Sequence, residues 1–167
     1  GVSLHWNSAA VIRESSSIQQ NGTPGGNFHH GLYVNEGSSA RVNTVTITTT
    51  MANANDGSAV NVFRGSVLRL RGINSITASA APTAGVVCPT NCPYGTDSLG
   101  RSSGGNAFEI GNLSYVRSDG GKTTVTGNVQ VYSQSRAEFR DMEITGLFAS
   151  AGGGSTLQLR DQSPADN

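Results

Sequence analysis

The sequence lacks long apolar runs, helical periodicity and an excess of charge of either sign. No apolar run approaches the ~20 residues that span a bilayer, and no stretch shows a sustained 3.6-residue apolar pattern with caps. The formal charge is zero, with 11 basic and 11 acidic residues, so no whole-molecule field favours nucleic acid or an anionic membrane. We therefore expect low helix content, no nucleic-acid partner and no membrane insertion.

Lysine and cysteine are scarce as well. Lys122 stands alone beside ten arginines, and the two cysteines, Cys88 and Cys92, lie in the segment CPTNC. No other cysteine or nearby histidine could complete a tetrahedral zinc site, so no metal and no cofactor are expected. The preferred interpretation is a disulfide between Cys88 and Cys92, which favours an extracellular, cell-surface or virion location. Two free thiols in a surface loop are the alternative.

Glycine and small polar residues are abundant instead. The 167 residues include 22 glycines, and only 13% of the chain is charged, a composition typical of a turn-rich all-β protein with a weakly charged surface. The length suits a single domain, 1–167. The sequence has no initiator methionine, basic n-region or apolar h-region at its start, so either a signal peptide has been removed or this is a fragment, and we expect a segment of a longer chain.

A repeat of short apolar alternations runs along the chain. Each copy has an anchor residue, apolar pairs six and four residues before it, alternating residues two and four after it, and an isoleucine or valine further on. The column four residues after the anchors is apolar throughout. The anchors are Ser8, Ser38, Ser66, Asn112, Ser135 and Ser155.

Each repeat therefore predicts three short strands separated by turns. The shortest repeats span about 20 to 23 residues, and the excess length falls in loops, above all in an insertion at 78–106 that contains both cysteines. This pattern predicts an all-β, right-handed parallel β-helix solenoid of about six rungs. An immunoglobulin-like sandwich is the rival fold, and it would pair neighbouring strands antiparallel.

The segments GSVLRLRGINSIT and SQSRAEFRDMEITG resemble rungs of right-handed parallel β-helix proteins of the pectate-lyase-like superfamily. That group includes polysaccharide lyases and hydrolases, phage tailspikes and bacterial surface adhesins. The resemblance implies a polysaccharide or cell-surface glycan as partner, and a homotrimer or end-to-end stacking on adjoining β-helix. The WIDH, RxPxxR and DPHE signatures of its enzymes are absent, so no active-site residue is carried over.

Arginine recurs five residues after the anchors and predicts a stripe on an outer face. Carboxylates follow some of these arginines, so a ladder of surface ion pairs is one interpretation. An anion-binding stripe for acidic polysaccharide is the other, because guanidinium groups bind carboxylate and sulfate bidentately. The stripe comprises Arg13, Arg71, Arg117, Arg140 and Arg160, and the candidate ligand-binding residues are Arg69, Arg71, Tyr115, Arg117 and Arg140.

Catalysis by this segment alone is not favoured. Glycosidases need two carboxylates on either side of the scissile bond, and the weak candidates are Glu138, Asp119 and Asp141. A structural, self-assembling β-helix shaft is one alternative to glycan recognition. A polysaccharide lyase or glycoside hydrolase whose site is completed by other chains is another.

The histidines and a threonine-rich segment complete the candidate residues. His29 and His30 lie in NFHHG and are expected in a solvent-exposed loop, with His5 near Trp6 in the first repeat.

In TVTITTT, Ile47 is expected to point inward between outward-facing threonines. Such a hydroxyl lattice resembles ice-binding β-helices, but interruptions in the other repeats argue against that function.

Overall fold

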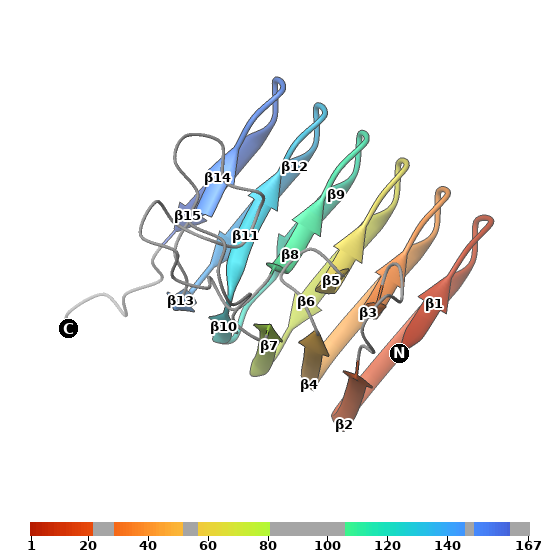
Figure 1. Ribbon diagram of the computed structural model, residues 1–167, viewed down its shortest axis with the longest axis vertical. Coiled ribbons are helices and arrows are strands. Elements are labelled where there is room, and N and C mark those ends of the chain that lie inside the picture. The colour runs from red at the N-terminus through yellow and green to blue at the C-terminus, as the bar shows by residue number, and fades with distance from the viewer. Residues whose placement is uncertain (22–28, 52–56, 81–105, 146–148, 161–167) are drawn as a thin grey trace, which may run out of the picture.

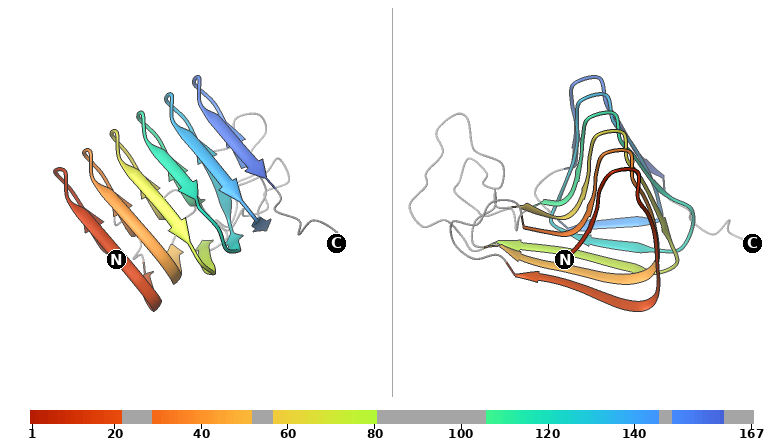
Figure 2. Two further views of the ribbon diagram at one scale, coloured as in Figure 1. Left: turned by 180° about the vertical axis from the view of Figure 1, so that it is seen from behind. Right: turned by 90° about the vertical axis from the view of Figure 1, so that its right-hand side faces the viewer.

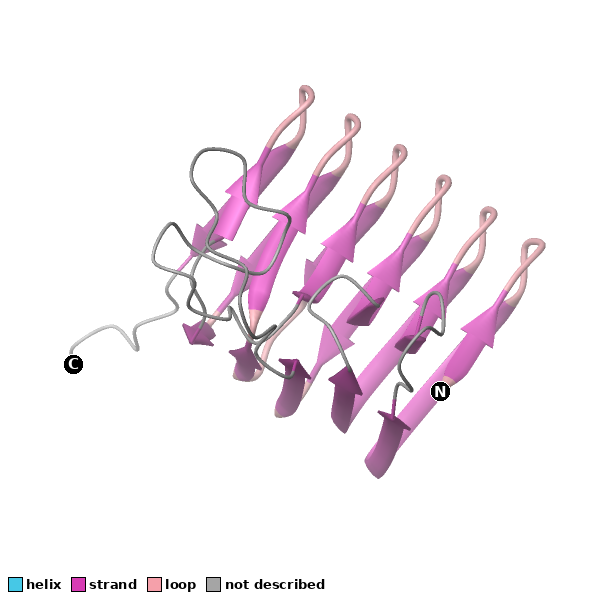
Figure 3. Ribbon diagram, in the orientation of Figure 1, coloured by secondary structure: helices cyan, strands magenta, loops and turns pink. Residues whose placement is uncertain are grey.

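The structure is a computed structural model that describes residues 1–21, 29–51, 57–80, 106–145 and 149–160. These residues contain no helix, and hence none that is long and apolar enough to cross a membrane (Figure 3). They form the strands β1 (Val2–Leu4), β2 (Ala9–Asn21), β3 (His29–Val34), β4 (Ser39–Met51), β5 (Gly57–Val62), β6 (Val67–Arg71), β7 (Asn74–Ala80), β8 (Asn106–Ile110), β9 (Tyr115–Ser118), β10 (Thr123–Thr126), β11 (Asn128–Val131), β12 (Arg136–Arg140), β13 (Met142–Thr145), β14 (Ala149–Ala151) and β15 (Thr156–Arg160).

Two parallel sheets contain all of these strands. The first sheet has the order β1-β3-β5-β8-β11-β14, and the second has the order β13-β10-β7-β4-β6-β9-β12-β15 with β2 beside β4. Every strand pair among the described residues is parallel. The prediction of an all-β fold with parallel strands is confirmed, and the antiparallel sandwich does not fit the pairing.

The first sheet grows by one strand per repeat, and the second sheet gains either one long strand, as with β2 and β4, or two short strands, as with β6 and β7. A repeat enters through a strand of the first sheet, passes a tight turn, and returns through the second sheet, where the long strands β2 and β4 bend and continue into a further segment. Figure 1 shows equivalent strands of successive repeats side by side, and the end-on view in Figure 2 shows two walls converging on the aligned turns. Stacking of this kind brings residues from different repeats together on one face.

The turn between the two sheets has the same backbone conformation in every repeat. Two consecutive residues have positive φ, the left-handed region that costs most residues energy. Glycine occupies both positions in only one repeat, so the stacked neighbours, and not glycine alone, hold this conformation. The pairs are Trp6 and Asn7, Glu36 and Gly37, Arg64 and Gly65, Asn112 and Leu113, Ser133 and Gln134, and Gly153 and Gly154.

A serine follows each turn, and four hydrogen bonds of these serines link turns of neighbouring repeats. The hydroxyl of Ser135 accepts a hydrogen bond from the backbone N–H of Ser114 at 3.1 Å, and the hydroxyl of Ser155 accepts from Ser135 at 3.0 Å. Equivalent bonds join Ser66 to Ser114 at 3.3 Å and Ser8 to Ser38 at 3.1 Å. These serines are called the serine ladder below. They supply acceptors for amides at the turn that no backbone carbonyl reaches.

The ladder corrects the predicted register of the fourth repeat. Its anchor is Ser114, two residues later than the predicted Asn112, and Asn112 instead occupies the turn with φ 54°. Val116 accordingly pairs with Leu68. With this shift, both Phe108 and Ile110 belong to the apolar pair before the anchor.

The predicted register requires an apolar residue four positions after every anchor, and this requirement misplaced the fourth repeat. The fourth repeat has Ser118 there, paired with Leu70 and 1% exposed. The Ser118 hydroxyl donates to the carbonyl of Arg140 at 3.1 Å, and Ser118 Oγ accepts from the Arg140 N–H at 2.6 Å. A buried polar side chain is tolerated when it is satisfied in this way.

The core lies between the sheets and consists of the inward columns. Leu32, Val60 and Val129 come from the first sheet, and Leu68 and Ile76 from the second; all five are fully buried. The rings of Phe108 and Phe139 pack at a centroid distance of 5.2 Å in the later repeats.

Ile47 points inward, as predicted, and is fully buried. Thr46 and Thr48 point outward and align with Ser75 and Thr77 of the neighbouring strand. Glu143 interrupts the hydroxyl array further along the sheet, opposite Thr124.

The predicted insertion at 78–106 is strand at both limits, because β7 extends to Ala80 and β8 starts at Asn106. Cys88 and Cys92, and with them the predicted disulfide, lie outside the described residues.

Candidate functional site

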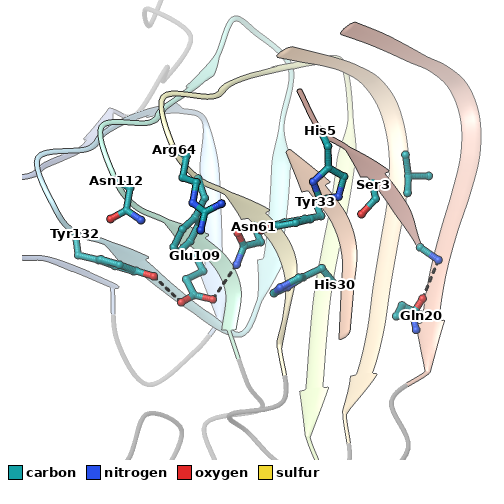
Figure 4. A pocket seen from close by; sticks show the side chains of 13 residues that line it. Ser3, His5, Gln20, His30, Tyr33, Asn61, Arg64, Glu109, Asn112 and Tyr132 are labelled. Carbon is teal, nitrogen blue, oxygen red and sulfur yellow. Dashed lines mark hydrogen bonds between the residues drawn. The ribbon is translucent and has the colours of Figure 1, made fainter. Parts of the chain in front are cut away.

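A groove of about 820 Å³ lies on the outer face of the first sheet. Outward residues of β1, β3, β5 and β8 line its floor, and residues of the aligned turns form one rim (Figure 4). Its principal side chains are His5, His30, Tyr33, Asn61, Phe63, Arg64, Glu109 and Tyr132. The groove therefore exists only where consecutive repeats stack.

Aromatic rings occupy two parts of the groove. The ring of Tyr33 stacks on His30 with centroids 5.0 Å apart, and His5 meets Tyr33 edge-on at 5.2 Å. Phe63 and Tyr132 form a second edge-on pair at 5.6 Å. These rings are partly exposed and present apolar surface to a ligand.

A carboxylate lies between the two aromatic groups. Glu109 Oε1 accepts a hydrogen bond from the Tyr132 hydroxyl at 2.7 Å, and Glu109 Oε2 accepts from Asn61 Nδ2 at 3.1 Å. Both bonds cross between repeats, since Asn61 belongs to β5, Glu109 to β8, and Tyr132 directly follows β11. Fixed by two donors, this carboxylate can accept hydrogen bonds from ligand hydroxyls in a defined direction.

The rim adds charge near Tyr33. Arg64 Nη1 and Glu36 Oε1 form an ion pair at 2.9 Å, and His5 Nδ1 lies 3.6 Å from the other Glu36 oxygen. Burial raises the pKa of Tyr33 above its ordinary value because it disfavours the phenolate; the positive charge of Arg64 opposes this, and Glu36 and Glu109 add to it. Tyr33 is thus a neutral hydroxyl, donor and acceptor, at neutral pH.

The expectation that His30 lies in an exposed loop is wrong. His30 belongs to β3, pairs with Ser58 of β5 and is half-buried, and its Nδ1 lies 3.0 Å from the Ser58 hydroxyl. Pairing with β5 includes His30 in the strand instead of a loop. The His29 side chain lies outside the described part of the chain.

The predicted arginine stripe lies on a different surface, the outer face of the second sheet. Arg71, Arg140 and Arg160 keep their predicted column, but the register shift moves Arg117 into the neighbouring one, where it aligns with Arg69. The column of Arg71 contains Asp119 in the fourth repeat. The predicted row of five equivalent arginines is therefore wrong, and two mixed columns replace it.

Asp119 links the two columns. One of its oxygens lies 2.5 Å from Arg117 Nε and the other 3.8 Å from Arg71 Nε. The charge of Asp119 is the largest cause that raises the pKa of Arg117 above its ordinary value. This weak catalytic candidate is thus held between two cations.

Tyr115 and Glu138 lie beside this pair. Glu138 aligns with Arg117, forms an ion pair with Arg136 and accepts a hydrogen bond from the Tyr115 hydroxyl at 3.3 Å. Tyr115 aligns with Val67 and Arg136, so it does not continue the column of Arg69 as predicted.

Asp141 lies at a bend with φ 53° and lines a separate hollow with Arg160. None of the three catalytic candidates lines the groove. Within the described ranges, no group of three or more His, Cys, Asp or Glu side chains is arranged to hold a metal ion.

The groove residues escaped the sequence analysis because they occupy outward columns in different repeats. Ser3, Tyr33, Asn61 and Glu109 align across four strands. A correct register for the fourth repeat would have placed Glu109 beside Asn61.

No protein-family model, curated protein or solved structure matches this chain.

Proposed function

We propose that this chain is a segment of right-handed parallel β-helix that binds a polysaccharide in the groove on its first sheet. The observation that carries the proposal is the Glu109 carboxylate, held by Tyr132 and Asn61 between two aromatic groups in a concave surface. The parallel strand order, in which equivalent strands of successive repeats are neighbours in each sheet, supports the fold. A phage tailspike or a surface adhesin, outside the cell or on a virion, is the setting we infer.

The chemistry of the groove suits a sugar chain. Sugar rings have apolar C–H faces that pack on aromatic side chains, and hydroxyl edges that need fixed donors and acceptors. Tyr33 and Phe63 offer the first, while Glu109 and Arg64 offer the second. The volume lies within the range of small-ligand sites, about 300 to 1,000 Å³.

Binding is favoured over hydrolysis. Glycoside hydrolases use two carboxyl groups roughly 5 to 10 Å apart. Glu109 is the one acidic residue among the described residues that line the groove, and the Glu36 carboxylate beside the rim is paired with Arg64. The two donors, Tyr132 and Asn61, hold the Glu109 carboxylate in place, as suits a group that binds a ligand.

A glycan array followed by titration of the best ligand tests this function. Tyr132→Phe removes the hydroxyl that orients Glu109, so we expect about tenfold weaker binding, the effect of losing one hydrogen bond to a charged group. Tyr115→Phe is the matched control, because it removes the same kind of tyrosine–glutamate bond on the other sheet. It should leave the affinity within about twofold of the parent.

Absence of binding across the array would refute the proposal. Equal effects of Tyr132→Phe and Tyr115→Phe would also contradict it, because the affinity would then not depend on the groove. Circular dichroism of both variants establishes that the sheets are intact.

A further inference from the structure

Three arginines lie at paired positions of three adjacent strands on the outer face of the second sheet. Arg41 pairs with Arg69, and Arg69 pairs with Arg117, in the parallel register of β4, β6 and β9. Neighbouring strands lie about 4.8 Å apart, so these guanidinium groups form a row with one charge per repeat. Arg71 is two residues beyond Arg69 on the same face. Arg41, Arg69, Arg71 and Arg117 are called the arginine cluster below.

Compensation of this charge is incomplete. Asp119 pairs with Arg71 and Arg117, whereas Arg41 and Arg69 form no ion pair with any residue of the described ranges. Like charges directly opposite one another on adjacent strands are destabilising. A chain with no net charge thus concentrates positive charge at one place on its surface.

The cluster is accessible. Arg69 is exposed, and the side chains of Arg71 and Arg117 are 49% and 37% exposed. Asp119 pairs with Nε of both Arg71 and Arg117, and so holds the two arginine side chains beside one another. Side chains held in this way lose less entropy when they bind an anion.

We propose that the arginine cluster is a second binding site, separate from the groove, for the carboxylate or sulfate groups of an acidic polysaccharide. A polymer that carries an anionic group on successive sugars can run across the strands and meet one guanidinium per repeat, each forming charge-assisted hydrogen bonds. The groove lies on the first sheet and the arginine cluster on the second, and Figure 2 shows these sheets as two walls that converge on the aligned turns. The proposal does not depend on whether the groove binds a glycan.

Nucleic acid fits the cluster less well. Single-stranded nucleic acid is held by aromatic platforms as well as by cations, and Tyr115, the aromatic residue next to Arg117 along the strand, has its hydroxyl bound to Glu138.

Binding of labelled polymers to the full chain at low and physiological salt tests the proposal. The probes are polygalacturonate, dextran sulfate, unmodified dextran and single-stranded oligothymidylate. Arg69→Gln combined with Arg117→Gln should weaken binding of an acidic polysaccharide by about tenfold or more, because at least two charge-assisted contacts are lost. Arg13→Gln combined with Arg160→Gln removes the same charge from the first and last repeats of the same face, and should change the affinity by less than about twofold.

Equal losses in the two double variants would overturn the proposal, because binding would then follow net charge alone. Tighter binding of oligothymidylate than of both acidic polysaccharides, or no binding of either polysaccharide, would overturn it as well. Tyr33→Ala in the groove separates the two sites. It should leave binding at the arginine cluster unchanged, whereas loss of binding in this variant would assign the acidic polymer to the groove.

Discussion

Replacing Ser135 by alanine tests whether the serine ladder holds successive turns together. Ser135 is 2% exposed, and its hydroxyl accepts the backbone N–H of Ser114 at 3.1 Å. Ser114 is equally buried, so in the alanine variant no water reaches the amide to replace the lost acceptor. The substitution changes no turn dihedral, because Ser135 does not belong to the positive-φ pair.

The expected cost follows from the unsatisfied amide. A buried donor that loses its partner costs about 1–3 kcal/mol, and alanine itself fits the space of serine without strain. For a chain of this size each kcal/mol lowers Tm by roughly 2–4 °C. Ser39→Ala is the matched control, since Ser39 is exposed and aligns with Ala9 and Val67 in neighbouring strands. It should stay within about 0.5 kcal/mol of the parent.

Urea denaturation gives the free energy of unfolding of both variants, and amide hydrogen exchange gives a local measure. The Ser114 amide should exchange faster in Ser135→Ala than in the parent. If Ser135→Ala and Ser39→Ala unfold at the same urea concentration and the Ser114 amide stays protected, the hydroxyl is not the acceptor that stabilises the turn.

Three further outcomes are expected. Phe139→Ala should lower the free energy of unfolding by about 3–5 kcal/mol in urea denaturation, because a fully buried ring leaves a cavity; a loss below about 1 kcal/mol would mean that the core closes over it. Gly111→Ala would place a Cβ 2.7 Å from Cε2 of Tyr132, so the ring must move, and glycan affinity in the groove should fall while Tm stays close to the parent value. Unchanged affinity would mean that the Tyr132 ring does not contact the ligand. The hydrogen bond and charge of Lys122 hold the pKa of Glu143 below its ordinary value, so their contribution to stability is present above the unfolded-state pKa and is lost as pH falls through the lower folded-state pKa. Carboxyl NMR titration should show that pKa rising in Lys122→Gln, and an unmoved pKa would exclude the pair in solution.

The apolar alternation predicted the strands well because every second residue of a strand points into the core and must be apolar. Ile18, Ile47, Ile76 and Val125 align as expected in the second sheet. An inward column tolerates few exceptions, so period-2 alternation finds it even without knowledge of the pairing.

The fourth repeat shows where that reasoning fails. Ser118 is polar and buried, and its hydrogen bonds to Arg140 can be recognised only when the two strands are already paired. Treating the column as apolar shifted the repeat by two residues, which kept every side chain on the correct face and exchanged one column for the next. Requiring a serine as the anchor would have found Ser114.

The candidate sites depended on this register more than the fold did. The arginine row was predicted with Arg117 in the wrong column, and Arg41 was missed, because membership of a column changes with a shift of two residues. Glu109 and Tyr132 meet across repeats, and their hydrogen bond has no signal in either local sequence.

Each strand pairs with the equivalent strands before and after it, and this pairing determines how such a chain can change in length. In the first sheet, β5 contacts β3 and β8, and β8 contacts β5 and β11. Duplication of one repeat would insert a strand between two existing neighbours, offering each of them the same backbone edge that it has now. The groove and the arginine cluster would lengthen or divide with it, so the number of repeats sets the length of each surface.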